Sequence, residues 1–200
     1  IAQRKYRTGL TEELFFKRIT EGGVHISTEG SAVGQVNGLM VYDEPDFGVP
    51  VRVTAKVSLG GGQLINVERD AKLTDELFDK GFMFMTGYLN WKYGQDRPLS
   101  LSASITREQA YRVAGDSASS TQLYALLSEL SGLPISQAIA VTGSVNQNGD
   151  VQVIGGATHK TEGFFDLCAA RGLDGTHGVI VPKDNLKNLV LKEEVVQAVR

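Results

Sequence analysis

Cysteine is nearly absent from this sequence: Cys168 stands alone among 200 residues, so the chain cannot form an internal disulfide. No group of Cys and His residues has the spacing of zinc ligands, and we expect neither a metal site nor cofactor-binding residues in the chain. Such sparing use of cysteine is typical of a reducing compartment and predicts a cytoplasmic protein. Long apolar runs are also missing, because none approaches the roughly 18 residues of a membrane span, and the first residues lack the apolar core of a signal peptide. We therefore expect no membrane segment, and the start at Ile1 instead of Met suggests a fragment.

The sequence also lacks a surplus of basic residues. Twenty Lys and Arg residues against 23 Asp and Glu residues give a net charge of −3, which predicts no nucleic-acid partner. The GxxxxGK[ST] pattern of a nucleotide-binding phosphate loop does not occur, so ATP is not expected to bind to this chain. Apolar residues, in contrast, make up 42% of the positions, and this is enough to build a globular core.

Patterns along the chain predict an N-terminal arm followed by one domain. Small and polar residues at 27–34 predict a flexible link between the two, and we place a domain boundary there. The arm is then residues 1–33, and the domain is residues 34–200. A helix is expected within the arm, ending at Gly22-Gly23, because four apolar residues have near-helical spacing: Leu10, Leu14, Phe15 and Ile19.

Strand and helix patterns alternate in the domain without a clean βαβ repeat, which predicts an α/β (α+β) fold. Gly48 is expected in the loop between the first two strands, and Thr158 is expected to cap a helix. Apolar residues of the first long helix, Met83, Met85 and Trp91, are expected in the core, with a substrate-facing groove as the alternative. Strands are expected at 36–42, 49–57, 99–105, 139–145, 151–154 and 178–181, and helices at 73–93, 119–131 and 159–170, with two short helices from 184 to the end.

The segment Gly115-Asp116-Ser117-Ala118-Ser119-Ser120 joins an expected strand to the start of an amphipathic helix. Free backbone N–H groups and the positive end of a helix stabilise an alkoxide, an oxyanion or a phosphate at such a place. The small side chains also allow a substrate backbone to approach. Ser and Asp are common helix caps as well, so a purely structural N-cap is an equal alternative for this segment.

A serine nucleophile needs a base, and the three histidines lie in the arm, at a helix start or in a turn, where they resemble surface residues. Lys160 is the better candidate, because helical spacing places it on the same inward face as Phe164, Leu167 and Cys168. Burial and the nearby helix N-terminus both lower the pKa of a lysine toward the range of a general base. The alternative is a lysine that extends from an apolar face to solvent.

Two blocks, GDSAS at 115–119 and VTGSVNQNGDVQVIGGATHK at 141–160, resemble the catalytic blocks of the Lon protease family, which uses a Ser–Lys dyad. The resemblance implies that Ser117 is the nucleophile and Lys160 the base. Upstream, VGQVNGLMVY at 33–42 resembles the first strand of the same domain, so the resemblance covers about residues 34–200. It is nearest to the archaeal-type and related bacterial members, and it implies a Lon-type proteolytic domain with mixed sheets and flanking helices.

The same resemblance implies supporting roles around the dyad. Thr142 is expected to position the lysine by hydrogen bonding, and the backbone around Asp116 and Ser117 is expected to help hold the oxyanion. Asp116 has two interpretations: an acid near the dyad that keeps Lys160 charged in a resting state, or a cap at the helix start. One position departs from the family, because members usually carry a glutamate where this chain has Ala114. That change leaves both dyad residues in place and puts substrate placement in doubt.

The resemblance implies a serine endopeptidase that belongs to an ATP-dependent protease and degrades unfolded, damaged or regulatory proteins. It implies an AAA+ module, with ATP and Mg, on the N-terminal side of the arm, and a homo-oligomer in the form of a hexameric ring. Two alternatives remain open. One is a small-molecule kinase of the galactokinase and homoserine kinase type, whose phosphate loop GDSASS resembles; the other is a catalytically silent domain that only helps to assemble a ring.

Overall fold

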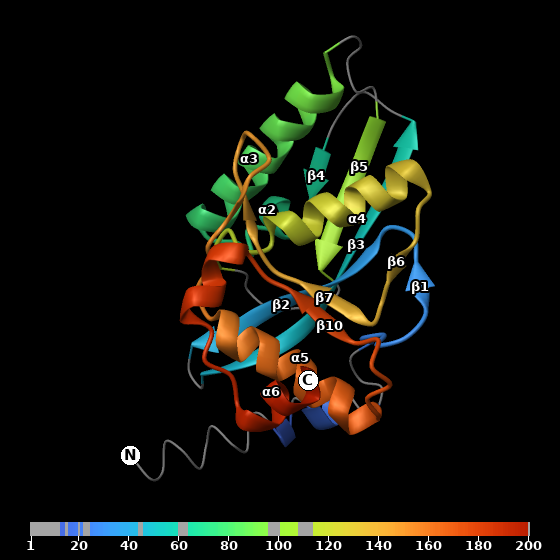
Figure 1. Cartoon of the computed structure of the whole chain (residues 1–200). Helices are drawn as coiled ribbons and strands as arrows, with labels where there is room; N and C mark the ends of the chain where they lie inside the picture. Colours follow the sequence, from blue (N-terminus) through green and yellow to red (C-terminus); the bar gives the residue numbers. More distant parts are fainter. Residues whose placement is uncertain are drawn as a thin grey trace.

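The computed structural model describes residues 13–14, 16–19, 21, 25–43, 46–59, 64–95, 101–107 and 114–199. A six-stranded mixed sheet lies at the centre of this described part, with the strand order β10-β7-β2-β3-β5-β4 (Figure 1). The predicted α/β (α+β) fold with mixed sheets and flanking helices is confirmed. The strands of the central sheet are β2 (Gln35–Asp43), β3 (Asp46–Leu59), β4 (Leu64–Asn66), β5 (Leu101–Arg107), β7 (Ile139–Val141) and β10 (Gly178–Ile180).

The long strand β3 connects the two halves of the sheet. Its residues 46–54 pair with β2 and its residues 53–59 pair with β5, both antiparallel. The outer strands pair in parallel: β7 with β2 and with β10, and β4 with β5. Alternate β-branched residues suit such a strand, since the pleat sends every second side chain to the same face. The alternating residues Val49, Val51, Val53 and Ala55 are buried, and Val57 on the same face is partly buried.

Helices cover the sheet in two separate groups. α3 (Glu76–Tyr93) and α4 (Ser119–Ser131) share one apolar cluster with β3 and β5, and α4 crosses these strands in the upper part of Figure 1. α5 (Ala157–Arg171) packs on β2, β3 and β10 in the lower part. The remaining elements are α2 (Val67–Asp70), the 3₁₀-helix η1 (Lys183–Asn188), α6 (Glu193–Val199) and two small antiparallel sheets, β1 (Ser31–Ala32) with β6 (Ile135–Ser136) and β8 (Ser144–Val145) with β9 (Val151–Gln152).

The strand expected at 139–145 is in fact two strands of different sheets, β7 and β8. Thr142 N–H still donates to the carbonyl of Ile180, which keeps it beside β10. At Gly143 the chain turns away, because its N–H donates to Ser117 O and its carbonyl accepts from Ser120 N–H. The break therefore brings this segment to the loop that precedes α4.

Three further expectations are wrong for local reasons. Thr158 lies inside α5 and does not cap it, because the helix begins at Ala157, two residues before the predicted start, after Gly156 in the left-handed conformation (φ 66°). Gly48 belongs to β3, where it pairs with Val41 of β2. Met85 is buried as predicted, but Met83 and Trp91 are exposed and do not belong to the core. Helical spacing identified the right helix but not the whole of its buried face.

Described residues that precede β1 also contact the core. Residues 13–14 and 16–19 are helical, and Ile19 and Ile26 are buried against Phe47 and Leu167. Arg171, at the end of α5, donates a hydrogen bond of 2.6 Å to the carbonyl of Ile26. Leu10 and Phe15 of the expected arm helix, and Gly22-Gly23, lie outside the described residues, and the division at 33/34 stays a prediction. Among the described residues, no helix combines the length and apolar character needed to cross a membrane.

Candidate active site

The loop that contains Ser117 leads directly into α4. Gly115 has φ 79°, a conformation that costs glycine little and other residues more. Ala118 is the N-cap residue of α4, and no side chain makes a capping hydrogen bond there, so the alternative of a structural cap by Asp or Ser is wrong. Ser117 is held through its main chain instead, because its carbonyl oxygen accepts from the N–H of Gly143 at 2.9 Å.

Lys160 reaches this loop from the first turn of α5. Its Nζ donates a hydrogen bond of 2.9 Å to the hydroxyl oxygen of Ser117. The lysine is 3% exposed, and it shares the buried face of α5 with Phe164, Leu167 and Cys168, as the spacing predicted. The alternative of a lysine that extends to solvent is therefore wrong. Within the part of the chain that the structure describes, no histidine hydrogen-bonds to Ser117.

Burial lowers the pKa of Lys160 to about 8, and the negative charge of Asp116 opposes this by favouring the charged amine. Burial is the larger cause, because an ammonium group loses its hydration when apolar side chains surround it. With a pKa of about 8, roughly one lysine in ten is neutral at pH 7, against fewer than about one in a thousand for an ordinary lysine. The site thus provides a neutral amine beside a hydroxyl group near physiological pH.

A close contact between two backbones sets the position of α5. A Cβ atom on Gly163 would overlap the carbonyl group of Gly48 in β3, and a Cβ on Gly48 would overlap the carbonyl of His159. Helix and strand can approach to this distance because both positions lack a side chain. Because His159 precedes Lys160, the contact between Gly48 and His159 fixes the first turn of α5, which carries the lysine.

Asp116 and Thr142 both lie beside the Ser117–Lys160 pair. The carboxylate of Asp116 accepts a hydrogen bond of 2.7 Å from the hydroxyl of Ser144 in β8, and its charge acts on Lys160. Thr142 is buried, and its hydroxyl donates to the carbonyl of Ser117 at 3.4 Å. The side chain of Thr142 therefore contacts the serine's main chain, and no hydrogen bond joins it to Lys160. Ala114 is exposed ahead of this group.

Backbone donors lie next to the hydroxyl of Ser117. Within the described residues, the N–H groups of Asp116 and Ser117 have no hydrogen-bond acceptor. Unpaired backbone N–H groups beside a nucleophile are the kind of donor that stabilises an oxyanion.

No group of three or more His, Cys, Asp or Glu side chains gathers as metal ligands in the described part of the chain. The arrangement favours acyl transfer by a serine with a lysine base.

Sequence reasoning missed three residues that hold this loop: Asp75, Gly81 and Ser144. Both carboxylate oxygens of Asp75 accept from the N–H of Gly115, at 3.0 and 3.1 Å. Gly81 packs directly against Asp116. Asp75 precedes an apolar helix pattern and was recognisable as a helix cap, but nothing in the sequence indicates a contact with a residue 40 positions away.

Comparisons with known proteins find relatives of this chain. Residues 107–200 match the family model described as Lon protease (S16) C-terminal proteolytic domain. A putative Lon protease homolog of Escherichia coli (strain K12) is 41% identical over 204 residues, which cover 100% of this chain and 35% of that protein. A putative Lon protease homolog of Haemophilus influenzae is 38% identical over 203 residues, covering 99% of this chain and 34% of the relative.

An archaeal Lon protease of Archaeoglobus fulgidus is more distant, at 32% identity over 171 residues, with 84% of this chain and 26% of the relative covered. The chain therefore spans about a third of the length of the two bacterial relatives, and about a quarter of the archaeal one. The family model covers both Ser117 and Lys160, since both lie within the matched residues.

Proposed function

This chain belongs to the Lon protease family, and from that premise we propose that Ser117 and Lys160 are the catalytic dyad of a serine endopeptidase. The observation that carries the proposal is the hydrogen bond of 2.9 Å between Lys160 Nζ and Ser117 Oγ, made by a lysine that is 3% exposed. A buried amine within hydrogen-bond reach of a hydroxyl meets the geometric requirement for a general base and its nucleophile.

In the proposed mechanism, neutral Lys160 accepts the proton of the Ser117 hydroxyl as Oγ attacks the carbonyl carbon of a peptide bond. The carbonyl oxygen becomes an oxyanion, which the N–H groups of Asp116 and Ser117 stabilise. The C–N bond then breaks, and the protonated lysine gives its proton to the leaving amine. Lys160, neutral again, takes a proton from water, whose oxygen attacks the carbonyl carbon of the acyl-enzyme. The bond from that carbon to Ser117 Oγ then breaks, and the protonated lysine returns its proton to Oγ. The acid product leaves, with Ser117 as the hydroxyl and Lys160 as the neutral amine.

Asp116 acts on this cycle through its charge. Because its carboxylate favours the ammonium form of Lys160, we propose that it keeps part of the enzyme in a resting, protonated state. The hydrogen bond from Ser144 holds the carboxylate in place. Thr142 is proposed to support Lys160 indirectly, through its contact with the carbonyl of Ser117.

The activity of the whole protein is part of the same proposal. We propose that the domain serves an ATP-dependent protease that degrades unfolded, damaged or regulatory proteins in the cytoplasm. In this scheme, ATP and Mg²⁺ act in an AAA+ module joined through the arm at residues 1–33, and the chains form a hexameric ring. The support for this scheme is the membership of the chain in the Lon protease family, to which its relatives also belong.

The test is cleavage of an unfolded protein by the parent protein, Ser117→Ala and Lys160→Met, with the products identified by mass spectrometry. Methionine retains the apolar volume of the buried lysine stem but cannot accept a proton. Of these three proteins, we expect only the parent to cleave. Lys187→Ala is the matched control, because Lys187 is an exposed lysine whose partner is a surface carboxylate, Asp184.

Labelling with a fluorophosphonate distinguishes the remaining outcomes, because this probe reports the reactivity of a serine without a protein substrate. A parent protein whose Ser117 is labelled but which cleaves nothing needs another component for substrate delivery. A parent that is neither labelled nor active contradicts the dyad and favours a catalytically silent domain. Binding of ATP by this chain would favour the kinase alternative.

A further inference from the structure

One carboxylate joins the start of α3 to the loop that contains Ser117. Oδ1 of Asp75 accepts from the N–H of Phe78 at 2.8 Å, which makes Asp75 the N-cap residue of α3. The same carboxylate accepts from the N–H of Gly115 with both oxygens, at 3.0 and 3.1 Å. Gly115 lies two residues before Ser117. Asp75 therefore caps the start of α3 and also binds a residue 40 positions away in the sequence.

α3 meets the loop at a second point, one and a half turns further along. A Cβ on Gly81 would lie 2.9 Å from Cβ and 3.1 Å from Cα of Asp116, so the helix backbone packs directly on the loop. Figure 1 shows the start of α4 next to the part of α3 nearest α2. The N-terminal part of α3 thus supports two successive residues of the loop, Gly115 by hydrogen bonds and Asp116 by packing.

The opposite side of the loop is held by the segment that follows β7. Gly143 N–H donates to the carbonyl of Ser117 at 2.9 Å, and the Ser144 hydroxyl donates to the Asp116 carboxylate at 2.7 Å. The loop is therefore clamped between α3 and residues 143–144. Gly115 is the residue of this loop whose backbone can change conformation most easily, because glycine has the widest choice of backbone conformations. Here it adopts φ 79°. A carboxylate that binds the N–H of this residue restricts that choice.

The hydrogen bonds between Asp75 and Gly115 also determine which backbone N–H groups of the loop remain free to bind an oxyanion. Asp75 occupies the N–H of Gly115, whereas the N–H groups of Asp116 and Ser117 have no acceptor within the described residues. Rotation of the peptide unit before Gly115 would free the N–H of Gly115 and change the orientation of Asp116 and Ser117. Displacement of a nucleophile by 1 Å is enough to cost about 100-fold in rate.

We propose that Asp75 is a positioning residue: through its hydrogen bonds to Gly115 it holds Ser117 within reach of Lys160 and orients the backbone donors of the loop. The inference rests on the proposed function, because it assigns Asp75 to the reaction of the Ser117–Lys160 dyad. Asp75 itself is not expected to touch the substrate.

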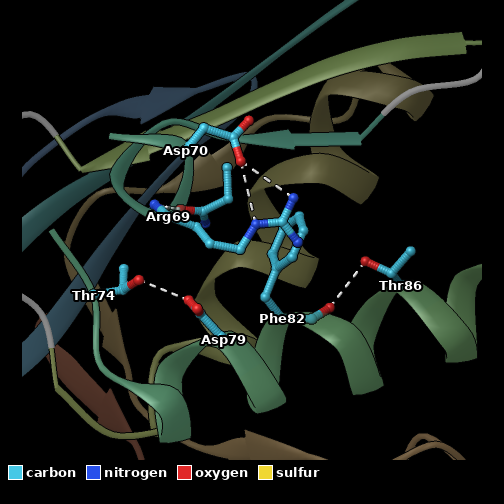
Figure 2. A network of polar contacts seen from close by, with 7 residues as sticks. Arg69, Asp70, Thr74, Asp79, Phe82 and Thr86 are labelled. Atoms are coloured by element: carbon cyan, nitrogen blue, oxygen red, sulfur yellow. Dashed lines mark hydrogen bonds and ion pairs between the residues drawn. The ribbon is translucent and has the colours of Figure 1, made fainter. Parts of the chain in front are cut away.

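Three substitutions separate this role from helix capping. Asp75→Ser keeps a good N-cap for α3, but the shorter side chain cannot extend to Gly115. Asp75→Asn retains an oxygen in the place of Oδ1, which accepts from both Phe78 and Gly115, but it replaces the second acceptor, Oδ2, with an NH2 group, and it is the partial rescue. Thr74→Ala is the matched control, because it removes the 2.6 Å bond from Thr74 to Asp79 in the same helix turn and leaves the loop untouched (Figure 2).

The variants are made in the complete natural protein and compared by kcat and KM on a peptide substrate, by the rate of fluorophosphonate labelling of Ser117, and by amide hydrogen exchange at Gly115. For Asp75→Ser we expect kcat and the labelling rate to fall by about 10- to 100-fold with little change in KM, because the nucleophile is displaced and substrate contacts are kept. The amide of Gly115 should exchange faster in Asp75→Ser. Asp75→Asn should lie between the parent and Asp75→Ser, and Thr74→Ala should stay close to the parent in all three measurements.

Each result has a distinct meaning. Parent-like kcat, labelling rate or Gly115 exchange in Asp75→Ser overturns the inference and leaves the proposed function intact. Equal losses in Asp75→Ser and Thr74→Ala also overturn it, because a general weakening of α3 would then explain both. A parent protein that neither cleaves nor is labelled overturns the proposed function, and the positioning role of Asp75 falls with it.

Discussion

The Nζ atom of Lys160 lies 2.9 Å from the Oγ atom of Ser117, although 43 positions separate the two residues in the sequence. Ser117 comes from the loop before α4, and Lys160 from the first turn of α5. α4 and α5 pack in different apolar clusters, so the contact between Ser117 and Lys160 depends on how each helix packs on the central sheet.

The first prediction concerns pH. Lys160 acts as a base when neutral, and burial places its pKa at about 8, so the rate of Ser117 acylation should rise with pH and level off above that value. From pH 7 to the plateau the gain should be roughly tenfold, since about a tenth of the amine is neutral at pH 7. Stopped-flow or discontinuous labelling with a fluorophosphonate from pH 6 to about 10 measures this. A rate that does not change across this range would contradict the role of Lys160 as the base.

The second prediction concerns Asp116→Asn. The carboxylate of Asp116 raises the pKa of Lys160, so its removal should shift the midpoint of the acylation profile to lower pH and increase the rate near pH 7. Asparagine retains an oxygen that accepts from Ser144, which preserves the local contact. The pH profile of labelling is the measurement, and Asp184→Asn, at an exposed carboxylate, is the control. A midpoint shifted upward would show that Asp116 does not act through its charge.

The third prediction concerns stability. An ordinary lysine has a pKa of 10.5 and Lys160 one of about 8, so the unfolded chain binds the extra proton between these values. Below pH 8 the folded state therefore carries a penalty on the order of 3 kcal/mol, which disappears as the pH rises from about 8 to 10.5. Lys160→Met should abolish activity yet raise the free energy of unfolding at pH 7.

Urea unfolding at several pH values checks this. The advantage of Lys160→Met over the parent should shrink toward pH 10, because the lysine of the parent is then neutral in the folded state. An advantage that is constant with pH would mean that packing, and not the desolvated charge, explains the difference.

The fourth prediction compares two helical glycines. Gly163→Ala places a methyl group against the carbonyl of Gly48 and should push α5 from the sheet, with a loss of about 1–3 kcal/mol in stability. Because the displaced helix carries Lys160, kcat should fall by at least about tenfold. Gly87→Ala in α3 is the control, since the nearest atom to its new Cβ is 3.8 Å away and alanine is the better helix former by about 1 kcal/mol. Thermal unfolding and peptide cleavage measure both effects. Parent-like activity of Gly163→Ala would show that α5 tolerates the shift.

Local pattern predicted the long helices and the strands of the central sheet except β4, and it also missed the short helix α2. Alternating valines predicted β3, and the periodic leucines before Gly132 predicted α4, which ends at that glycine with φ 69°. Periodicity also predicted that Lys160 lies on the buried face of α5. Such patterns succeed because each depends on residues that are close in the sequence and meet the same apolar surface.

Local pattern failed where a distant contact decides the outcome. The run at 139–145 is apolar enough for one strand, but hydrogen bonds of Gly143 to Ser117 and Ser120 draw it out of the central sheet. Met83 and Trp91 carry apolar side chains, yet they lie on the exposed face of α3. The sequence alone does not show which apolar side chains of a helix will be buried against residues from distant parts of the chain.

By itself, the sequence determined the class of fold, the family resemblance and the identities of the two candidate dyad residues, because these follow from residue types at short spacing. Only the tertiary structure decided that Lys160 meets Ser117, that Gly48 and Gly163 bring α5 onto β3, and that Asp75 holds the loop at Gly115. These contacts join residues from 40 to more than 110 positions apart, as the numbering shows. Their geometry depends on packing across the whole sheet, since a hydrogen bond requires both partners within about 3 Å and no local pattern carries that distance.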